Sequence, residues 1–150
     1  MNTSVNPAIR SGALLAINLM LLMVWGFAGI DKLRSGIPAW FDDKFGATFL
    51  ASFPGLSATF WLLTAAELAA FLLAGIALFR GEFIRRSTPI WLMSTLVWSL
   101  FVFLQLALGQ WLTADFNGTF QMFVYFGITL LMLQFTMNTR REAKSGYDIE

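Results

Sequence analysis

Residues 59–79, TFWLLTAAELAAFLLAGIALF, form a long apolar run in which Glu67 is the only charged side chain. Such a run indicates the fold class. A helix rises about 1.5 Å per residue, so about 20 apolar residues cross the roughly 30 Å hydrocarbon core of a bilayer. Similar runs occupy residues 11–33, 89–110 and 117–138. None shows the apolar and polar alternation of a barrel strand. The sequence therefore predicts an all-α integral membrane four-helix bundle, in one transmembrane domain over residues 1–150.

The composition agrees with a membrane protein and excludes several classes of function. Of 150 residues, 57% are hydrophobic and 13% are charged, against about 25% charged in ordinary soluble domains. Cysteine and histidine are absent, which excludes disulfides, thiol redox chemistry, thiolate or imidazole metal sites and histidine-based triads. The net charge of +1 does not indicate a nucleic-acid partner. We predict no metal site and no covalently bound cofactor.

Lysine and arginine counts predict the orientation, because cytoplasmic loops are enriched in both residues. One side carries Arg10, Arg80, Arg85, Arg86, Arg140, Arg141 and Lys144, and the other carries Lys32, Arg34 and Lys44. We therefore expect a multi-pass protein of the inner (cytoplasmic) membrane with both termini in the cytoplasm. The first span exceeds the roughly 7 to 15 apolar residues of a signal peptide, so we expect it to be retained. Residues 140–150 are expected to form a loose charged tail.

The connection between the first two spans is rich in aromatic residues. Phe41, Phe45, Phe49 and Phe53 recur every four residues, a spacing that stays on one face of a helix. We predict a short amphipathic helix over residues 38–53, lying at the membrane interface. It either covers the end of the bundle or forms a lid over a site that opens on that side of the membrane.

Glu67 is the most informative single residue, because a charge near the middle of a span costs at least about 2.5 to 3.5 kcal/mol. Protonation of the carboxyl, or a cationic or hydrogen-bonding partner, must offset that cost. Polar residues within the predicted spans could provide such a partner: Asn18, Gln105, Gln121, Tyr125 and Gln134. Glu67 is then either a hydrogen bond that joins helices or a site for a proton or ligand.

Charged residues near the end of the first span offer a second candidate site. Asp31, Lys32 and Arg34 lie at the interface, where lysine and arginine can reach the head groups, so a surface role is expected. Alternatively, Lys32 or Arg34 turns inward and forms a polar site with Asp42 or Asp43.

Most of the six tryptophans lie near the ends of the spans, as in the aromatic belts of membrane proteins. Trp98 lies deeper and could line a slot for a flat hydrophobic ligand such as a quinone ring. Gln105, in the same predicted span, is a further candidate for binding such a ligand.

Three segments resemble the DoxX-like family of small membrane proteins: GFAGIDKL at residues 26–33, PAWF at residues 38–41 and AELAAFLLAGIALFRG at residues 66–81. The first matches a G-x-x-K-L ending at Gly29, Lys32 and Leu33. The third matches an E-L-x-x-x-L-L-x-G core at Glu67, Leu68, Leu72, Leu73 and Gly75. The resemblance implies a four-helix bundle in a quinone-linked respiratory context, without a catalytic motif. The family is named for a thiosulfate:quinone oxidoreductase component, but a chain without cysteine cannot carry sulfur on a thiol.

Three functions are compatible with these observations. In the first, the chain is a subunit of a redox-linked complex that binds quinone or lipid between its helices, and Glu67 or Lys32 handles the proton. In the second, it is a structural or assembly subunit that contacts other membrane proteins. In the third, it is a small proton-coupled carrier in which Glu67 titrates.

Overall fold

The computed structural model describes residues 6–84 and 88–145. Within those residues the regular secondary structure is all helical, with no strand. Its elements are α1 (Pro7–Ser35), α2 (Ala39–Phe45), the 3-10 helix η1 (Phe49–Ala51), α3 (Leu56–Phe79), α4 (Ile90–Leu112) and α5 (Phe116–Ser145). Four of these, α1, α3, α4 and α5 as far as Asn138, are long and apolar enough to cross a membrane. The predicted four-helix membrane bundle is confirmed.

The spanning helices are longer than the predicted runs. The first begins at Pro7, where the Asn6 side chain accepts a hydrogen bond from the Ala8 N–H at 2.9 Å and caps the helix. The last continues to Ser145, into the stretch predicted to be a loose tail. Arginine, glutamate, alanine and lysine dominate residues 140–144 and favour helix, so α5 extends past the apolar span. Residues 146–150 of the predicted tail lie outside the described residues.

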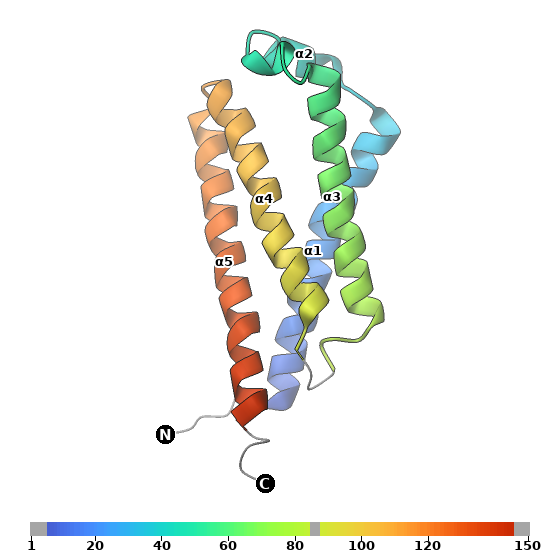
Figure 1. The fold of residues 1–150 in the computed structure, drawn as a ribbon, viewed down its shortest axis with the longest axis vertical. Helices are drawn as coiled ribbons and strands as arrows, with labels where there is room; N and C mark the ends of the chain where they lie inside the picture. The colour runs from blue at the N-terminus through green and yellow to red at the C-terminus, as the bar shows by residue number, and fades with distance from the viewer. Residues whose placement is uncertain (1–5, 85–87, 146–150) are drawn as a thin grey trace.

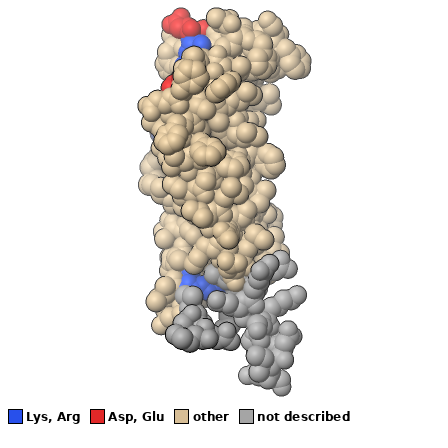
Figure 2. All heavy atoms as spheres, turned by 90° about the vertical axis from the view of Figure 1, so that its left-hand side faces the viewer, with Lys and Arg blue, Asp and Glu red and all other residues tan. Residues whose placement is uncertain are grey.

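The helices pack in the order α1, α3, α4, α5, and α1 touches α5 only slightly. The first spanning helix begins and the last ends at the same end of the bundle, and α2 lies across the opposite end (Figure 1). In the view of Figure 2, the visible charged side chains lie mainly near the two ends, with a long uncharged belt between them. Such a belt is what a membrane-spanning bundle presents to lipid.

Small residues let α1 and α3 approach closely. A Cβ atom on Gly29 would lie 2.8 Å from Cδ2 of Leu68, and one on Gly26 would lie 2.9 Å from the Phe71 ring. On the facing helix, Ala70 and Ala74 are fully buried. Glycine and alanine at such spacings are typical of close contacts between membrane helices.

A buried carboxylate fixes the start of α4. Glu82, in the connection after α3, accepts hydrogen bonds from the backbone N–H groups of Trp91 and Leu92 at 3.0 and 2.9 Å. These N–H groups belong to the first turn and have no partner within the helix. The carboxylate therefore acts as a cap from outside the helix.

The predicted interfacial helix over residues 38–53 is shorter than expected. It ends at Phe45, because the Thr48 hydroxyl and N–H both donate to the Phe45 carbonyl, at 2.7 and 2.9 Å, and close the last turn. The four phenylalanines therefore do not share one helical face. Phe41 and Phe45 are buried against Phe60 of α3. Phe49 and Phe53 are exposed.

Candidate functional site

Lys32 and Glu67 form an ion pair between α1 and α3. The Lys32 Nζ atom lies 2.9 Å from Oε1 and 2.8 Å from Oε2 of Glu67, and 3.4 Å from the Ala28 carbonyl oxygen. The Glu67 side chain is 1% exposed, whereas that of Lys32 is 25% exposed. The ammonium group therefore offsets the charge of the buried carboxylate and still reaches an open space.

This ion pair shows which way the Lys32 side chain turns and which residue is the partner of Glu67. Lys32 does turn inward, but its partner is Glu67 and not Asp42 or Asp43. Among the described residues, none of the five predicted partners (Asn18, Gln105, Gln121, Tyr125 and Gln134) hydrogen-bonds to the carboxylate, and Asn18 instead faces the α3 backbone at Ala74. The sequence could not identify the pair, because nothing in it states which turn of α1 meets the middle of α3.

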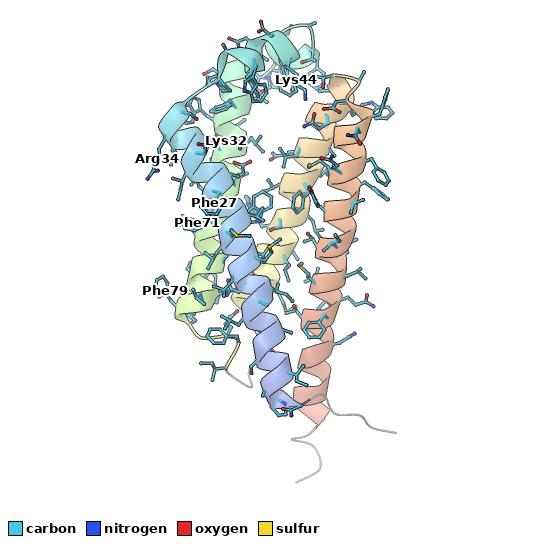
Figure 3. The ribbon with its side chains drawn as sticks, turned by 180° about the vertical axis from the view of Figure 1, so that it is seen from behind. Phe27, Lys32, Arg34, Lys44, Phe71 and Phe79 are labelled. Atoms are coloured by element: carbon cyan, nitrogen blue, oxygen red, sulfur yellow. The ribbon has the colours of Figure 1, made fainter. Side chains whose placement is uncertain are left out.

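The open space is a cavity of about 550 Å³ beneath α2, walled by α1, α3 and α4. Figure 3 places Lys32 below Lys44, which projects from α2. The lining comprises Asp31, Lys32, Ser35, Gly36, Pro38, Trp40, Phe41, Lys44, Phe45, Leu50, Pro54, Thr59, Phe60, Leu62, Leu63, Gln105, Leu106, Leu108, Gly109 and Gln110. Sites for small molecules are typically of this size, mostly apolar and furnished with a few polar groups.

Two of the predicted ligand residues, Asp31 and Gln105, line this cavity together with Lys32. Gln105 is exposed within the α4 span, and its amide makes no hydrogen bond to any other described residue. An amide without a partner in a membrane span is costly, and a ligand could bind it as donor or acceptor.

The remaining predicted residues lie outside the cavity. Arg34, Asp42 and Asp43 are exposed. Figure 3 shows the Arg34 side chain directed away from the bundle. Trp98 lies on a shallow groove between α3 and α4, where its indole N–H donates to the Ala66 carbonyl at 2.9 Å. Trp98 therefore lines this groove and not the cavity beneath α2, and its role in binding a flat ligand stays a prediction.

Lys44 was not predicted, yet it fastens α2 over the cavity. Its Nζ atom lies 2.7 Å from Oε1 of Gln110 and 3.2 Å from Oδ2 of Asp115. We call these contacts the α2 latch. The Gly118 N–H that donates to Asp115, and then the Lys44 ammonium, hold the pKa of Asp115 below its ordinary value. The sequence does show a lysine in the first connection and an aspartate, Asp115, that caps α5. It does not show that the fold brings the two side chains together.

Below the cavity lies a packed layer at the level of Trp25, which we call the floor. The Trp25 indole N–H donates to the Ser99 hydroxyl at 2.8 Å, and that hydroxyl donates to the Thr95 carbonyl at 2.7 Å. The Phe103 ring packs on Trp25 with centroids 5.0 Å apart. Trp25 and Ser99 are both buried. These contacts join α1 to α4 in the packed part of the bundle, and none of Trp25, Ser99 and Phe103 lines the cavity.

The groups at the site are able to hydrogen-bond a small molecule and to exchange a proton. No group of three potential metal-ligating side chains occurs within the part of the chain that the structure describes. The cavity offers aromatic surface, an amide and an ammonium group in contact with a carboxylate. No family model, curated protein or solved structure matches this sequence.

Proposed function

We propose that this chain is a DoxX-like integral membrane subunit that binds a quinone and serves a redox-linked membrane complex. The observation that carries the proposal is that Lys32, whose ammonium group is paired with the buried Glu67 carboxylate, lines an aromatic cavity. Lys32 and Glu67 also belong to the two separate motifs that resemble the family. Their contact across two helices supports a common role for both motifs.

The geometry supports a specific binding mode. A quinone carbonyl takes the place of the Ala28 carbonyl at Lys32, because that is the longest of the three contacts of the ammonium group. The amide of Gln105 donates to a second quinone oxygen, and Trp40 and Phe60 cover the ring.

Proton supply follows from the same placement. Reduction of a quinone to a quinol takes two electrons and two protons, and a redox partner subunit supplies the electrons. In each step Lys32 donates a proton to a quinone oxygen and takes a replacement from water at the α2 end. Glu67 positions the ammonium group and stabilises its charge.

The proposal includes the membrane and the orientation. We place the chain in the inner membrane with both termini in the cytoplasm, because seven of its lysines and arginines lie on that side by sequence. The cavity and α2 then face the opposite side of the membrane.

The test is purification of the full chain from native membranes with a C-terminal affinity tag, in mild detergent. Mass spectrometry then identifies bound quinones and co-purifying proteins. We expect a stoichiometric quinone and a redox complex. Recovery of the chain alone, without quinone, contradicts the proposal and leaves the proton-coupled carrier to be tested by transport.

Matched variants assign the binding to the cavity. Lys32→Met should abolish quinone recovery, whereas Arg34→Met, an exposed position on the same turn outside the lining, should leave it unchanged. Gln105→Leu keeps the ion pair intact and should still weaken binding. If all three variants retain the quinone, the cavity is not its site.

One observation favours a second function, that of a structural subunit. Only 11% of the most apolar stretch of α5 is buried inside the bundle, against 28 to 33% of the corresponding stretches of the other spans. Gln121 and Gln134 are exposed on this helix and bond to no other described side chain. Such amides join helices in membranes. If Gln121→Leu and Gln134→Leu detach the chain from its complex while Leu104→Ala does not, α5 is the contact with the partner.

A further inference from the structure

Beyond its first turn, which Glu82 caps, α4 makes polar contacts with its neighbours at two levels. At the lower level, Ser99 accepts from Trp25 of α1 and Trp98 donates to Ala66 of α3. At the upper level, the α2 latch joins Lys44 to Gln110 and Asp115. The adjacent residues Trp98 and Ser99 thus hold α4 to both helices of the opposite pair at the same height.

Between these levels α4 stands apart from α1 (Figure 3). The ring of Phe103 completes the floor, and the Phe45 ring next meets α4 at Gly109, where it would lie 3.5 Å from an added Cβ atom. Within residues 6–84 and 88–145, no hydrogen bond or ion pair joins α4 to α1 or α3 between residues 103 and 109. These six steps span about 9 Å of helix. We call this opening the lateral gap, and Figure 3 shows α1 and α4 diverging there beneath α2.

The lateral gap opens toward lipid. Leu62 of α3 and Leu108 of α4 line the cavity and are 59% and 49% exposed. Both lie in helices long enough to span the membrane. By contrast, α2 covers the aqueous end, with Phe41 and Phe45 buried beneath it. The apolar side of the cavity is therefore open, and α2 lies across the aqueous end, where Asp31 and Trp40 of the lining are also exposed.

The charges of the site favour a neutral ligand. Lys32 is paired with Glu67, and Lys44 is paired with Asp115, so neither ammonium group is left to attract an anion. The amide of Gln105, which lines the cavity and has no bond within the described chain, offers both a donor and an acceptor.

We infer that the cavity is loaded from the bilayer through the lateral gap, by a neutral amphiphile whose polar ring binds Gln105 and Lys32 while its apolar tail stays in the leaflet on the α2 side. The α2 latch closes the aqueous side to solutes larger than water. This inference rests on the proposed function for the identity of the ring, but its geometry stands on the contacts above.

The test measures which solvent reaches the cavity. The chain has no cysteine, so Leu106→Cys carries a single nitroxide on the cavity lining and leaves Gln105 in place. Leu104→Cys, exposed on the same helix outside the lining, reports lipid, and Ser52→Cys, exposed before α3, reports water. The variants are reconstituted in phosphatidylethanolamine and phosphatidylglycerol vesicles. Power saturation then compares collisions with oxygen, which partitions into lipid, and with a charged nickel chelate, which stays in water.

We expect the label at position 106 to resemble the one at 104, with frequent oxygen collisions and nickel collisions about tenfold or more below those at 52. Adding Lys44→Met should raise nickel collisions at 106 and not at 104. Nickel collisions at 106 equal to those at 52, with the latch intact, overturn the inference.

A second arm separates the route from the ligand. A long-chain benzoquinone in the vesicles should lower oxygen collisions at 106 and leave those at 104 unchanged. If the route holds but the benzoquinone has no effect, the inferred access is supported and the proposed quinone function is wrong.

Discussion

The contact of α1 with α3 and the separation of α4 from α1 differ in the size of the facing side chains. Gly26 and Gly29 let α1 lie directly against α3. Toward α4, the same helix presents Trp25, which meets the ring of Phe103. Small residues therefore join two helices into one wall, whereas large residues hold the third helix away and leave room for a cavity.

The largest effect is expected at the ion pair that continues the contact of α1 with α3. Lys32→Met leaves the Glu67 carboxylate buried without its partner, which should cost about 3 to 5 kcal/mol of unfolding free energy. Denaturant unfolding in detergent measures this loss. The double variant Lys32→Met with Glu67→Leu should recover most of it, because apolar pairs of similar volume replace buried ion pairs well. A double variant as unstable as Lys32→Met contradicts this account.

A smaller loss of unfolding free energy is expected when a larger side chain is placed between α1 and α3. Gly29→Ala places a Cβ atom 2.8 Å from Leu68 Cδ2 and should destabilise the bundle by about 1 to 3 kcal/mol. Gly75→Ala is the matched control, since nothing lies within 4 Å of the added atom. It should be neutral or stabilising, by up to about 1 kcal/mol. Equal losses from the two variants would show that the close approach is unimportant.

The floor of the cavity is the next test. Ser99→Ala removes the acceptor of the buried Trp25 indole N–H and should cost about 1 to 2 kcal/mol. Ser94→Ala, exposed on the same helix, should change nothing. The fluorescence of Trp25, followed with the other five tryptophans replaced by phenylalanine, reports whether the floor has opened. An unchanged spectrum and stability would rule out this hydrogen bond as the floor.

The smallest effect is expected in the α2 latch, on acidification. The pKa of Asp115 is lowered in the folded chain from its ordinary value of 3.8, so its carboxylate stabilises the fold above that value. This contribution is lost as the pH falls below 3.8 through the lowered pKa. A nitroxide on Ala39→Cys of α2 should gain mobility in that window. Asp115→Asn should abolish the pH dependence, and an identical profile would contradict the assignment.

The sequence predicts the spans well because bilayer thickness fixes their length, whatever the packing. It also identifies Glu67, since a buried charge is costly wherever its partner lies. Its partner Lys32 could be assigned only as a surface residue or an inward alternative, because the contact depends on how α1 is set against α3. The latch was missed for the same reason, and the phenylalanine spacing overestimated α2 because Thr48 closes the helix early.

The separation in sequence of these contacts has a consequence for biogenesis. Lys32 and Glu67 are 35 residues apart, whereas the floor contact of Trp25 with Ser99 and the latch contact of Lys44 with Asp115 span 74 and 71 residues. Membrane helices insert first and associate afterwards. During synthesis, the ion pair can therefore form once α3 has inserted. The cavity beside it is enclosed only after the ribosome has synthesised α4 and the turn that follows it.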